Sequence, residues 1–261
     1  MGNMIKKPIL YSYSRLNTYD SCGWKYKLNY VDKKYISINN IANLLGTLIH
    51  SVEENIAICL QRGEPINYEY WKEYFMNVNI PKKSVYDTDG DIYGINILKE
   101  KYHDDFYAIN EKTGQSYFTK CMDYLNTGMY RLEKYMQAHP ELEIYDVEHY
   151  FEINFHGLII KGYIDRIFKN KETGEYIIED IKTKDHPFDQ KDLTTPLQFV
   201  IYSIALQKQL TLNDYPTHCT YDLPLCDMKQ EAGTKGFIAR GIKKLDKIIA
   251  GITANEFVPK P

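Results

Sequence analysis

Two apolar segments joined by a polar turn constrain the fold of this chain more than any other stretch. From Lys161 to Lys184 the sequence is KGYIDRIFKNKETGEYIIEDIKTK. Apolar and β-branched residues are frequent in 158–168 and 175–182. The polar residues and the glycine of Asn170–Gly174 between them are typical of a hairpin loop. The sequence therefore predicts two strands that pair as a β-hairpin.

Charged side chains lie inside these predicted strands. Because side chains alternate between the two faces of a strand, Asp180 and Lys182 share one face and Glu179 lies on the other. Asp165 is on the neighbouring strand. Charges are rare in the middle of a strand unless they have a partner or hold a metal ion. We therefore expect these side chains to pair with one another or to bind a cation.

The combination of Asp165, Asp180 and Lys182 suits metal-dependent hydrolysis. Carboxylate oxygens are the ligands that Mg²⁺ and Mn²⁺ prefer. Such a cation lowers the pKa of a bound water and neutralises charge on a phosphodiester. A lysine beside it orients that water or stabilises the developing negative charge. The alternative is a cross-strand ion pair on a solvated face of the sheet, without a catalytic role.

The length and composition fit one large soluble domain. The 261 residues are 44% hydrophobic and 26% charged, which is ordinary for a globular protein. No apolar run approaches the roughly 18–20 residues of a membrane helix, and the first residues lack the apolar core of a signal peptide. These features predict a cytoplasmic protein without a membrane partner. The Asn-, Lys- and Tyr-rich composition suits a bacterial or phage-infected cell.

Positive charge is concentrated at both ends of the sequence. The net charge is −3, but residues 1–40 carry a balance of +5 and residues 229–247 a balance of +4. The net charge argues against a dedicated nucleic-acid coat protein. If the two ends fold together, they make one basic surface for a phosphate backbone. Solvated helix faces are the simpler explanation of such charge runs.

Helical and strand patterns cover most of the remaining chain. The polar, tyrosine-rich segment 61–140 is predicted to form an inserted helical lobe with a loop at Ile80–Asp91. Further strands are expected at Tyr145–Phe155 and His218–Leu223. The expected helices are one capped by Ser12 or Ser14, then Asn40–Leu60, Tyr68–Met76, Thr113–Gln137, a helix from Thr195-Pro196 to about Leu210, and Thr234–Ile252.

Two residues on these predicted helices have simple structural explanations. His50 lies inside the Asn40–Leu60 helix, where a lone histidine is usually structural or merely exposed. Gln198 follows Thr195 by three residues, which fits a capping box at the start of a helix. Neither residue indicates a functional site by itself.

Four short motifs occur together in this chain, and their combination favours a functional site over these structural explanations of His50 and Gln198. They are Gly46-Thr-Leu-Ile-His50, Gly162-Tyr-Ile-Asp165, Glu179-Asp180-Ile-Lys182 and Gln198-Phe-Val-Ile-Tyr202. Their order and approximate spacing resemble those of RecB-type nucleases of the PD-(D/E)XK superfamily, in the branch of the exonucleases and CRISPR-adaptation nucleases. The opening segment SYSRLNTYDSCGWKYKL is similar to the start of that family. The resemblance covers both ends and the centre of the chain, but not residues 61–140.

The resemblance implies a restriction-endonuclease-like α/β fold with a mixed central sheet flanked by helices. Residues 1–261 would form a single nuclease domain with a helical insertion at about 61–140. The implied metal ligands are His50, Asp165, Asp180 and the backbone carbonyl of Ile181.

The same resemblance assigns roles to side chains around the metal. Lys182 would position or activate the attacking water, and Gln198 and Tyr202 would lie beside this lysine and the bound strand. Glu53 and Glu54 follow His50 on its helix by three and four residues; either could approach the metal, but we expect them on a solvated face.

The cysteines depart from the pattern of many RecB-type relatives. Those relatives hold an iron–sulfur cluster with one early cysteine and three late ones. Cys22 stands where the early ligand would be, whereas Cys219 and Cys226 lie before the position of the late group. These three cysteines make an incomplete set, so the sequence predicts no iron–sulfur cluster in this chain.

The implied function is a metal-dependent DNA nuclease that uses Mg²⁺ or Mn²⁺. An exonuclease acting on linear ends or single strands, in recombination, repair or phage DNA processing, fits best. The alternative is a catalytically silent nuclease-fold protein that binds nucleic acid or a partner, which the presence of His50, Asp165, Asp180 and Lys182 argues against. A third alternative is an enzyme that uses the same carboxylates on a small phosphorylated substrate. It would need a phosphate-cradling glycine loop, and none is visible in the sequence. Trimers and helicase-bound subunits both occur among related nucleases, so the sequence leaves a homo-oligomer and a helicase or recombination partner open.

Overall fold

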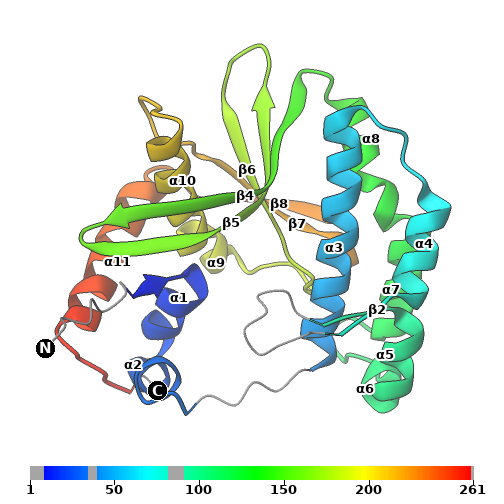
Figure 1. Cartoon of the computed structure of the whole chain (residues 1–261), viewed down its shortest axis with the longest axis horizontal. Coiled ribbons are helices and arrows are strands. Elements are labelled where there is room, and N and C mark those ends of the chain that lie inside the picture. The colour runs from blue at the N-terminus through cyan, green and yellow to red at the C-terminus, as the bar shows by residue number, and fades with distance from the viewer. Residues whose placement is uncertain (1–8, 35–39, 82–90, 260–261) are drawn as a thin grey trace, which may run out of the picture.

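A mixed six-stranded sheet lies at the centre of the protein (Figure 1). The structure is a computed structural model that describes residues 9–34, 40–81 and 91–259. The sheet has the order β1-β5-β6-β7-β8, and β4 pairs with β5. The strands are β1 (Leu10–Tyr11), β4 (Leu142–Phe155), β5 (Leu158–Asn170), β6 (Tyr176–Ile181), β7 (His218–Leu223) and β8 (Met228–Ala232).

Strand β5 connects the parts of this sheet. It pairs antiparallel with β4 along its whole length, antiparallel with β6 and parallel with β1. β6 pairs in parallel with β7, which pairs antiparallel with β8. Helices flank this mixed sheet, so the predicted restriction-endonuclease-like fold is confirmed.

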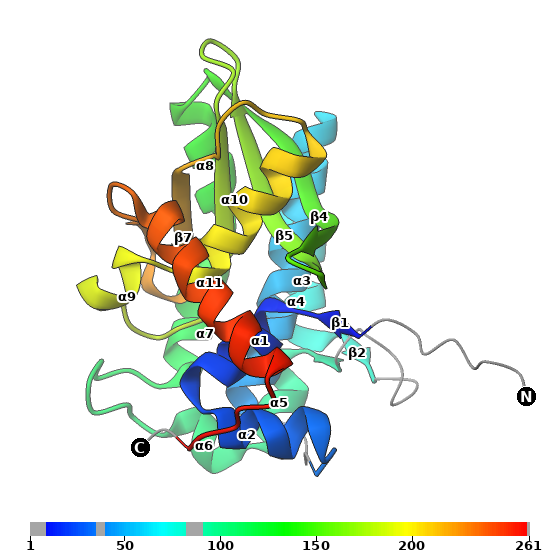
Figure 2. The same ribbon diagram turned by 90° about the vertical axis from the view of Figure 1, so that its left-hand side faces the viewer.

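Two groups of helices flank the sheet (Figures 1 and 2). The first part of the chain contributes α1 (Tyr13–Ser21), α2 (Gly23–Tyr26), a π-helical turn (Lys27–Val31), α3 (Ile41–Arg62), α4 (Tyr68–Asn77), α5 (Ile95–Lys101), α6 (His103–Tyr107), α7 (Tyr117–Asn126) and α8 (Arg131–Ala138). The second part contributes α9 (Gln190–Thr194), α10 (Leu197–Gln209) and α11 (Phe237–Thr253). Among the described helices, none is long and apolar enough to cross a membrane.

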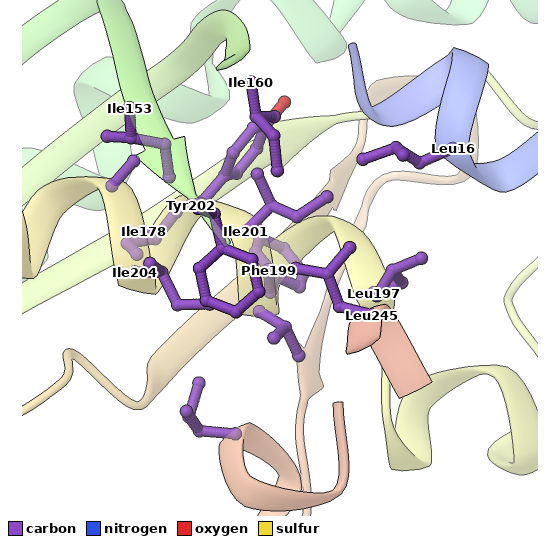
Figure 3. Close-up of a cluster of buried hydrophobic side chains, with 14 of the residues drawn as sticks. Leu16, Ile153, Ile160, Ile178, Leu197, Phe199, Ile201, Tyr202, Ile204 and Leu245 are labelled. Carbon is purple, nitrogen blue, oxygen red and sulfur yellow. The ribbon is translucent and has the colours of Figure 1, made fainter. Parts of the chain in front are cut away.

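The helices pack around two hydrophobic cores, and α1 and α2 of the first part of the chain share a core with α10 and α11. One core lies between the sheet and α10, with α1 and α11 around it, and Figure 3 shows its central side chains. Every residue from Leu197 to Leu206 is buried, because α10 has the sheet on one side and α11 on another. The second core lies between α3, the helices α4 to α8 and one end of the sheet. α3 therefore joins the helices of 68–138 to the strands.

The structure confirms most predicted elements within a few residues. The strand at His218–Leu223 has the predicted bounds, and the hairpin strands and the long helix around His50 are present. The predicted helix Thr113–Gln137 is instead two helices with a 3₁₀ turn at Gly128–Tyr130. A Cβ atom on Gly128 would lie 2.5 Å from the ring of Tyr124, so this close contact needs a glycine.

Two further predictions differ in detail. α10 begins at Leu197 with Pro196 as its N-cap residue, one position later than the predicted Thr195 cap. Residues 82–90 of the predicted Ile80–Asp91 loop lie outside the described residues. Their flanks form an unpredicted antiparallel ladder of β2 (Asn79–Ile80) and β3 (Ile92–Tyr93).

The two basic ends of the chain lie side by side. Figure 2 shows α1 next to the end of α11. Lys244 Nζ lies 2.7 Å from Asp20 Oδ2, and the Tyr19 hydroxyl donates a hydrogen bond to the Glu256 carbonyl at 2.7 Å. Residues 1–8 and 35–39 of the basic N-terminal segment lie outside the described residues.

A buried guanidinium ties α3 to three strands. The side chain of Arg166 on β5 has no exposed surface. Its Nη1 lies 2.6 Å from Glu179 Oε1 on β6 and 3.7 Å from Asp222 Oδ2 on β7, and its Nη2 lies 3.3 Å from Glu53 Oε2 on α3. Lys229 of β8 also pairs with Glu179. Burial acts to lower the pKa of Arg166, but the carboxylates outweigh it and raise that pKa, so the group stays charged.

The expectation that Glu53 lies on a solvated helix face is wrong. Its side chain is buried and also accepts a hydrogen bond from the Tyr124 hydroxyl at 2.9 Å. The sequence gives no sign of this pairing because Arg166 is more than a hundred positions away. Glu179 does lie on the face opposite Lys182, as strand alternation predicts.

Arg166→Met is expected to lower the free energy of unfolding by about 3–5 kcal/mol, because it leaves buried carboxylates without their counter-charge. Lys169→Met on the same strand is the control. Lys169 is only half-buried, and its replacement should cost less than about 1 kcal/mol. Urea unfolding at equilibrium measures both. Equal losses in the two variants would contradict the structural role of Arg166.

Candidate active site

Three side chains with metal-ligating atoms meet where α3 crosses β4 and β5. They are His50 of α3, Glu148 of β4 and Asp165 of β5. Each offers one ligand atom, and the three atoms lie within 4.8 Å of one another. The His50 Nδ1 and Asp165 Oδ2 atoms are 3.8 Å apart. This cluster is the one such group within residues 9–34, 40–81 and 91–259.

Glycines in two of the sequence motifs permit the close approach of these elements. A Cβ atom on Gly46, one helical turn before the histidine, would lie 3.1 Å from Thr183 Oγ1. A Cβ atom on Gly162 would lie 2.9 Å from the ring of Phe151. Phe151 packs edge-on against Tyr202 with ring centroids 5.8 Å apart. A larger residue at either glycine would therefore push apart elements that form the site.

Asp180 lies beside this group and is held by its neighbours. Its Oδ1 accepts hydrogen bonds from Gln198 Nε2 at 2.6 Å and from the Tyr202 hydroxyl at 3.4 Å. Its Oδ2 forms an ion pair with Lys182. Gln198 Nε2 also lies 2.7 Å from the Tyr202 oxygen. Gln198 thus binds Asp180 and makes no side-chain cap to α10, so the capping-box explanation is wrong.

The backbone of Ile181 connects the two carboxylate-bearing strands. Its N–H donates a hydrogen bond to Asp165 Oδ2 at 2.6 Å. The Ile181 backbone also acts on His50: burial lowers the pKa of the imidazole, and hydrogen bonding to this backbone opposes that shift. The structure therefore brings together the four predicted metal ligands, with His50 and Asp165 inside the closest group and Asp180 and Ile181 adjacent to it.

The protonation of the site follows from burial and from crowded carboxylates. Burial lowers the pKa of His50, so its imidazole is neutral and able to act as a ligand. Burial raises the pKa of Asp180 to about 6, and Asp165 adds to this against the effect of Lys182. Burial acts to lower the pKa of Lys182, but Asp180 and Asp165 outweigh it, so that pKa is raised and the ammonium keeps its proton.

Glu148 is the member of the site that the sequence analysis missed. It lies opposite Asp165, between the paired positions Val147–Arg166 and His149–Ile164. Its φ of 49° is in the left-handed region, which costs a residue with a side chain about 1–3 kcal/mol and recurs at functional sites. Burial, with added repulsion from Asp165, Glu54 and Asp180, raises its pKa to about 8.

The turn between β4 and β5 has a sequence feature from which the position of Glu148 opposite Asp165 could have been predicted. His156 and Gly157 both have positive φ, as the two central residues of a type I′ hairpin turn do. A two-residue turn at this position fixes the register and places Glu148 across from Asp165.

Tyr13 at the start of α1 is a second residue that the sequence did not reveal. Burial raises the pKa of its phenol, which is also close enough to Lys182 and Asp180 to feel their opposing charges. Ser12 caps this helix by accepting a hydrogen bond from the Arg15 N–H at 3.2 Å. The cap fixes the start of α1, where the phenol of Tyr13 is within electrostatic range of the lysine of the site.

The donor set fits a divalent cation. Burial raises the pKa of Glu148 and of Asp180, and repulsion from Asp165 adds to both shifts. A cation among them would relieve this repulsion, and two carboxylates with a neutral imidazole are a ligand set that divalent metals accept.

The cysteines lie elsewhere: Cys219 is buried in the sheet, and Cys226 Sγ contacts the Lys184 carbonyl at 3.4 Å. The absence of an iron–sulfur cluster stays a prediction.

Comparison with known proteins adds a family to this geometry. The sequence model of the PD-(D/E)XK nuclease superfamily matches residues 11–254. The Gene 69 protein of Mycobacterium phage D29 is 26% identical over 223 residues, which cover 77% of this chain and 70% of that protein. A crystal structure named "Putative exonuclease" from Eubacterium rectale has a TM-score of 0.48 and 10% identity, covering 94% of this chain and 80% of the other.

Glu148→Gln is expected to weaken Mn²⁺ binding at least about tenfold, because replacing even an indirect partner of a metal ligand costs about 10–100-fold. Titration calorimetry of the purified protein with MnCl₂ measures this. Glu152→Gln is the matched control, since Glu152 is an exposed glutamate on the same strand. Equal affinities of the two variants would show that Glu148 does not bind the metal.

Proposed function

The chain belongs to the PD-(D/E)XK nuclease superfamily, and we propose that it is a metal-dependent deoxyribonuclease, more specifically an exonuclease. The observation that supports this most is the meeting of a neutral imidazole, three carboxylates and one ammonium at the junction of α3, β4, β5 and β6. Residues 1–261 would form a single nuclease domain, with the helices of about 61–140 as an inserted lobe.

We propose that Mg²⁺ or Mn²⁺ is the cofactor. His50, Glu148 and Asp165 would hold it, with Asp180 and the carbonyl of Ile181 on the adjacent side. The cation would neutralise negative charge that develops on the phosphodiester. Burial and repulsion from neighbouring carboxylates raise the pKa of Glu148, and this supports a role as a ligand because a cation among these groups would favour its ionised form.

The side chains around the cation divide into two roles. Lys182 would donate hydrogen bonds to the attacking water and to the phosphate oxygens, since its ammonium remains protonated. Hydrolysis adds the water oxygen to phosphorus and expels one sugar oxygen, which takes up a proton. Gln198 and Tyr202 are buried behind Asp180 and would act as positioning residues that fix its Oδ1.

An exonuclease fits the described architecture better than a sequence-specific endonuclease. Reading a sequence in a duplex needs an element that enters a groove and contacts base edges. The described helices of this chain pack on one of its two hydrophobic cores. The basic charge where α1 meets α11 supports contact with a phosphate backbone. The 26% identical relative is a phage protein, which supports a role in phage DNA processing, recombination or repair.

Digestion of end-labelled linear DNA is expected in Mn²⁺ or Mg²⁺, with covalently closed circles left intact and no digestion in EDTA. Lys182→Ala should lower the rate at least about 100-fold, as loss of one group that stabilises transition-state charge does. Lys208→Ala is the control, because Lys208 is an exposed lysine on α10 that donates to the Asn154 carbonyl.

Three other outcomes would change this proposal. Cutting of circles that is lost in Lys182→Ala would make the enzyme an endonuclease with the same active site. Survival of every substrate while DNA is still bound would favour a catalytically silent binding protein. Full activity of Lys182→Ala would contradict the assigned active site.

A further inference from the structure

Two exposed tyrosines lie on the sheet face that also bears the site. Tyr150 of β4 and Tyr163 of β5 are cross-strand partners, with exposed fractions of 45% and 54%. Their ring centroids are 5.3 Å apart and the rings are tilted by 56°. The Tyr150 hydroxyl donates a hydrogen bond to Glu152 Oε2 at 2.9 Å, which restrains this ring.

Strand alternation places these rings beside the proposed metal ligands. Ile164 and Phe151 are buried and face α10, so their neighbours Tyr163, Asp165 and Tyr150 face the other way. Tyr163 precedes Asp165 by two residues, which is roughly 6.6 Å along a strand. This is about two nucleotide steps along a stacked strand, at roughly 3.4 Å each. A nucleotide next to the cleaved phosphate can therefore reach the rings.

We infer that Tyr150 and Tyr163 form a platform on which bases of single-stranded DNA stack beside the cleaved phosphate. The inference rests on the proposed function and names its substrate as a single strand. Bases inside a duplex are stacked on each other and offer no free face, whereas bases of a single strand stack on aromatic side chains.

The surroundings of the pair favour recognition through ring faces and not through charge. The next cross-strand pair on the same face is Glu152 with Lys161, one negative and one positive residue. A mixed pair adds little net attraction for phosphate. Cross-strand aromatic pairs also stabilise sheets, but that role does not require both tyrosines to be about half exposed. β4 and β5 extend beyond β6 here (Figure 1), and the exposure of Tyr150 and Tyr163 shows that this face of the two strands is accessible.

The test compares DNA with and without bases. The affinity of a fluorescein-labelled dT₁₂ strand is measured by anisotropy in EDTA, where no cleavage occurs. Tyr163→Ala and Tyr150→Ala should each bind dT₁₂ about tenfold more weakly, as loss of one stacking ring does. Tyr163→Phe should stay within about twofold of the wild type because it keeps the ring. A 12-mer of abasic sites and a 12-bp duplex should bind wild type and alanine variants alike.

Tyr215→Ala is the matched control. Tyr215 is exposed to a similar extent, 41%, but it precedes β7 and lies near Tyr176, at the start of β6 and away from Asp180. Thermal unfolding of each variant reports whether it is folded, and Tyr163→Phe provides a folded comparison for Tyr163→Ala. Unchanged dT₁₂ affinity in both alanine variants would overturn the inference, and so would an equal loss on the abasic strand.

Digestion by the wild-type protein separates this inference from the proposed function. Digestion of DNA together with unchanged dT₁₂ affinity in the alanine variants overturns the platform alone. If the wild type digests no DNA in Mn²⁺ or Mg²⁺, the proposed function is wrong, while the binding comparison still decides whether the rings stack on bases.

Discussion

The guanidinium of Arg166 and its three carboxylates hold the elements of this protein in place. Arg166 directly follows Asp165 on β5, and α3 contacts both residues, Asp165 through His50 and Arg166 through Glu53. Asp165 belongs to the metal-ligand group, and Arg166 contacts Glu53, Glu179 and Asp222. Because breaking a buried ion pair costs several kcal/mol, the position of each partner is strongly restrained. Arg166, which restrains these elements, is thus the next residue in the chain after Asp165 of the candidate active site.

This restraint also sets the position of α3 relative to the sheet. Glu53 follows His50 by three residues, so both side chains project from neighbouring turns of the same helix. The contact of Glu53 with Arg166 fixes the helix, and the helix then carries His50 to Asp165 at 3.8 Å. On the strand side, Gln198 and Tyr202 of the buried helix α10 fix Asp180 in the same way. The site is therefore supported from two directions by buried polar contacts.

The sequence predicted the elements whose signals are local. The hairpin at Asn170–Gly174, the strand His218–Leu223 and the helix around His50 each have a periodicity or turn signal within a short window. The motif residues were recognisable because their order and spacing resemble a family. The structure brings them together at one junction.

Residues that depend on long-range pairing were not predictable in this way. Glu53 has the spacing of a solvated helix face, and only the position of Arg166 shows that it is buried. Glu148 belongs to no motif, and it joins the site through the register that the His156-Gly157 turn imposes on β4 and β5. Tyr13 reaches the site because β1 pairs with β5 over only two positions and α1 follows at once.

The most direct test of this account is anomalous diffraction from crystals of the protein grown with Mn²⁺. The account predicts a manganese peak bound by His50, Glu148 and Asp165, with Asp180 and the Ile181 carbonyl on its adjacent side. A peak bound by other residues, with these three side chains not in contact with it, would contradict the account.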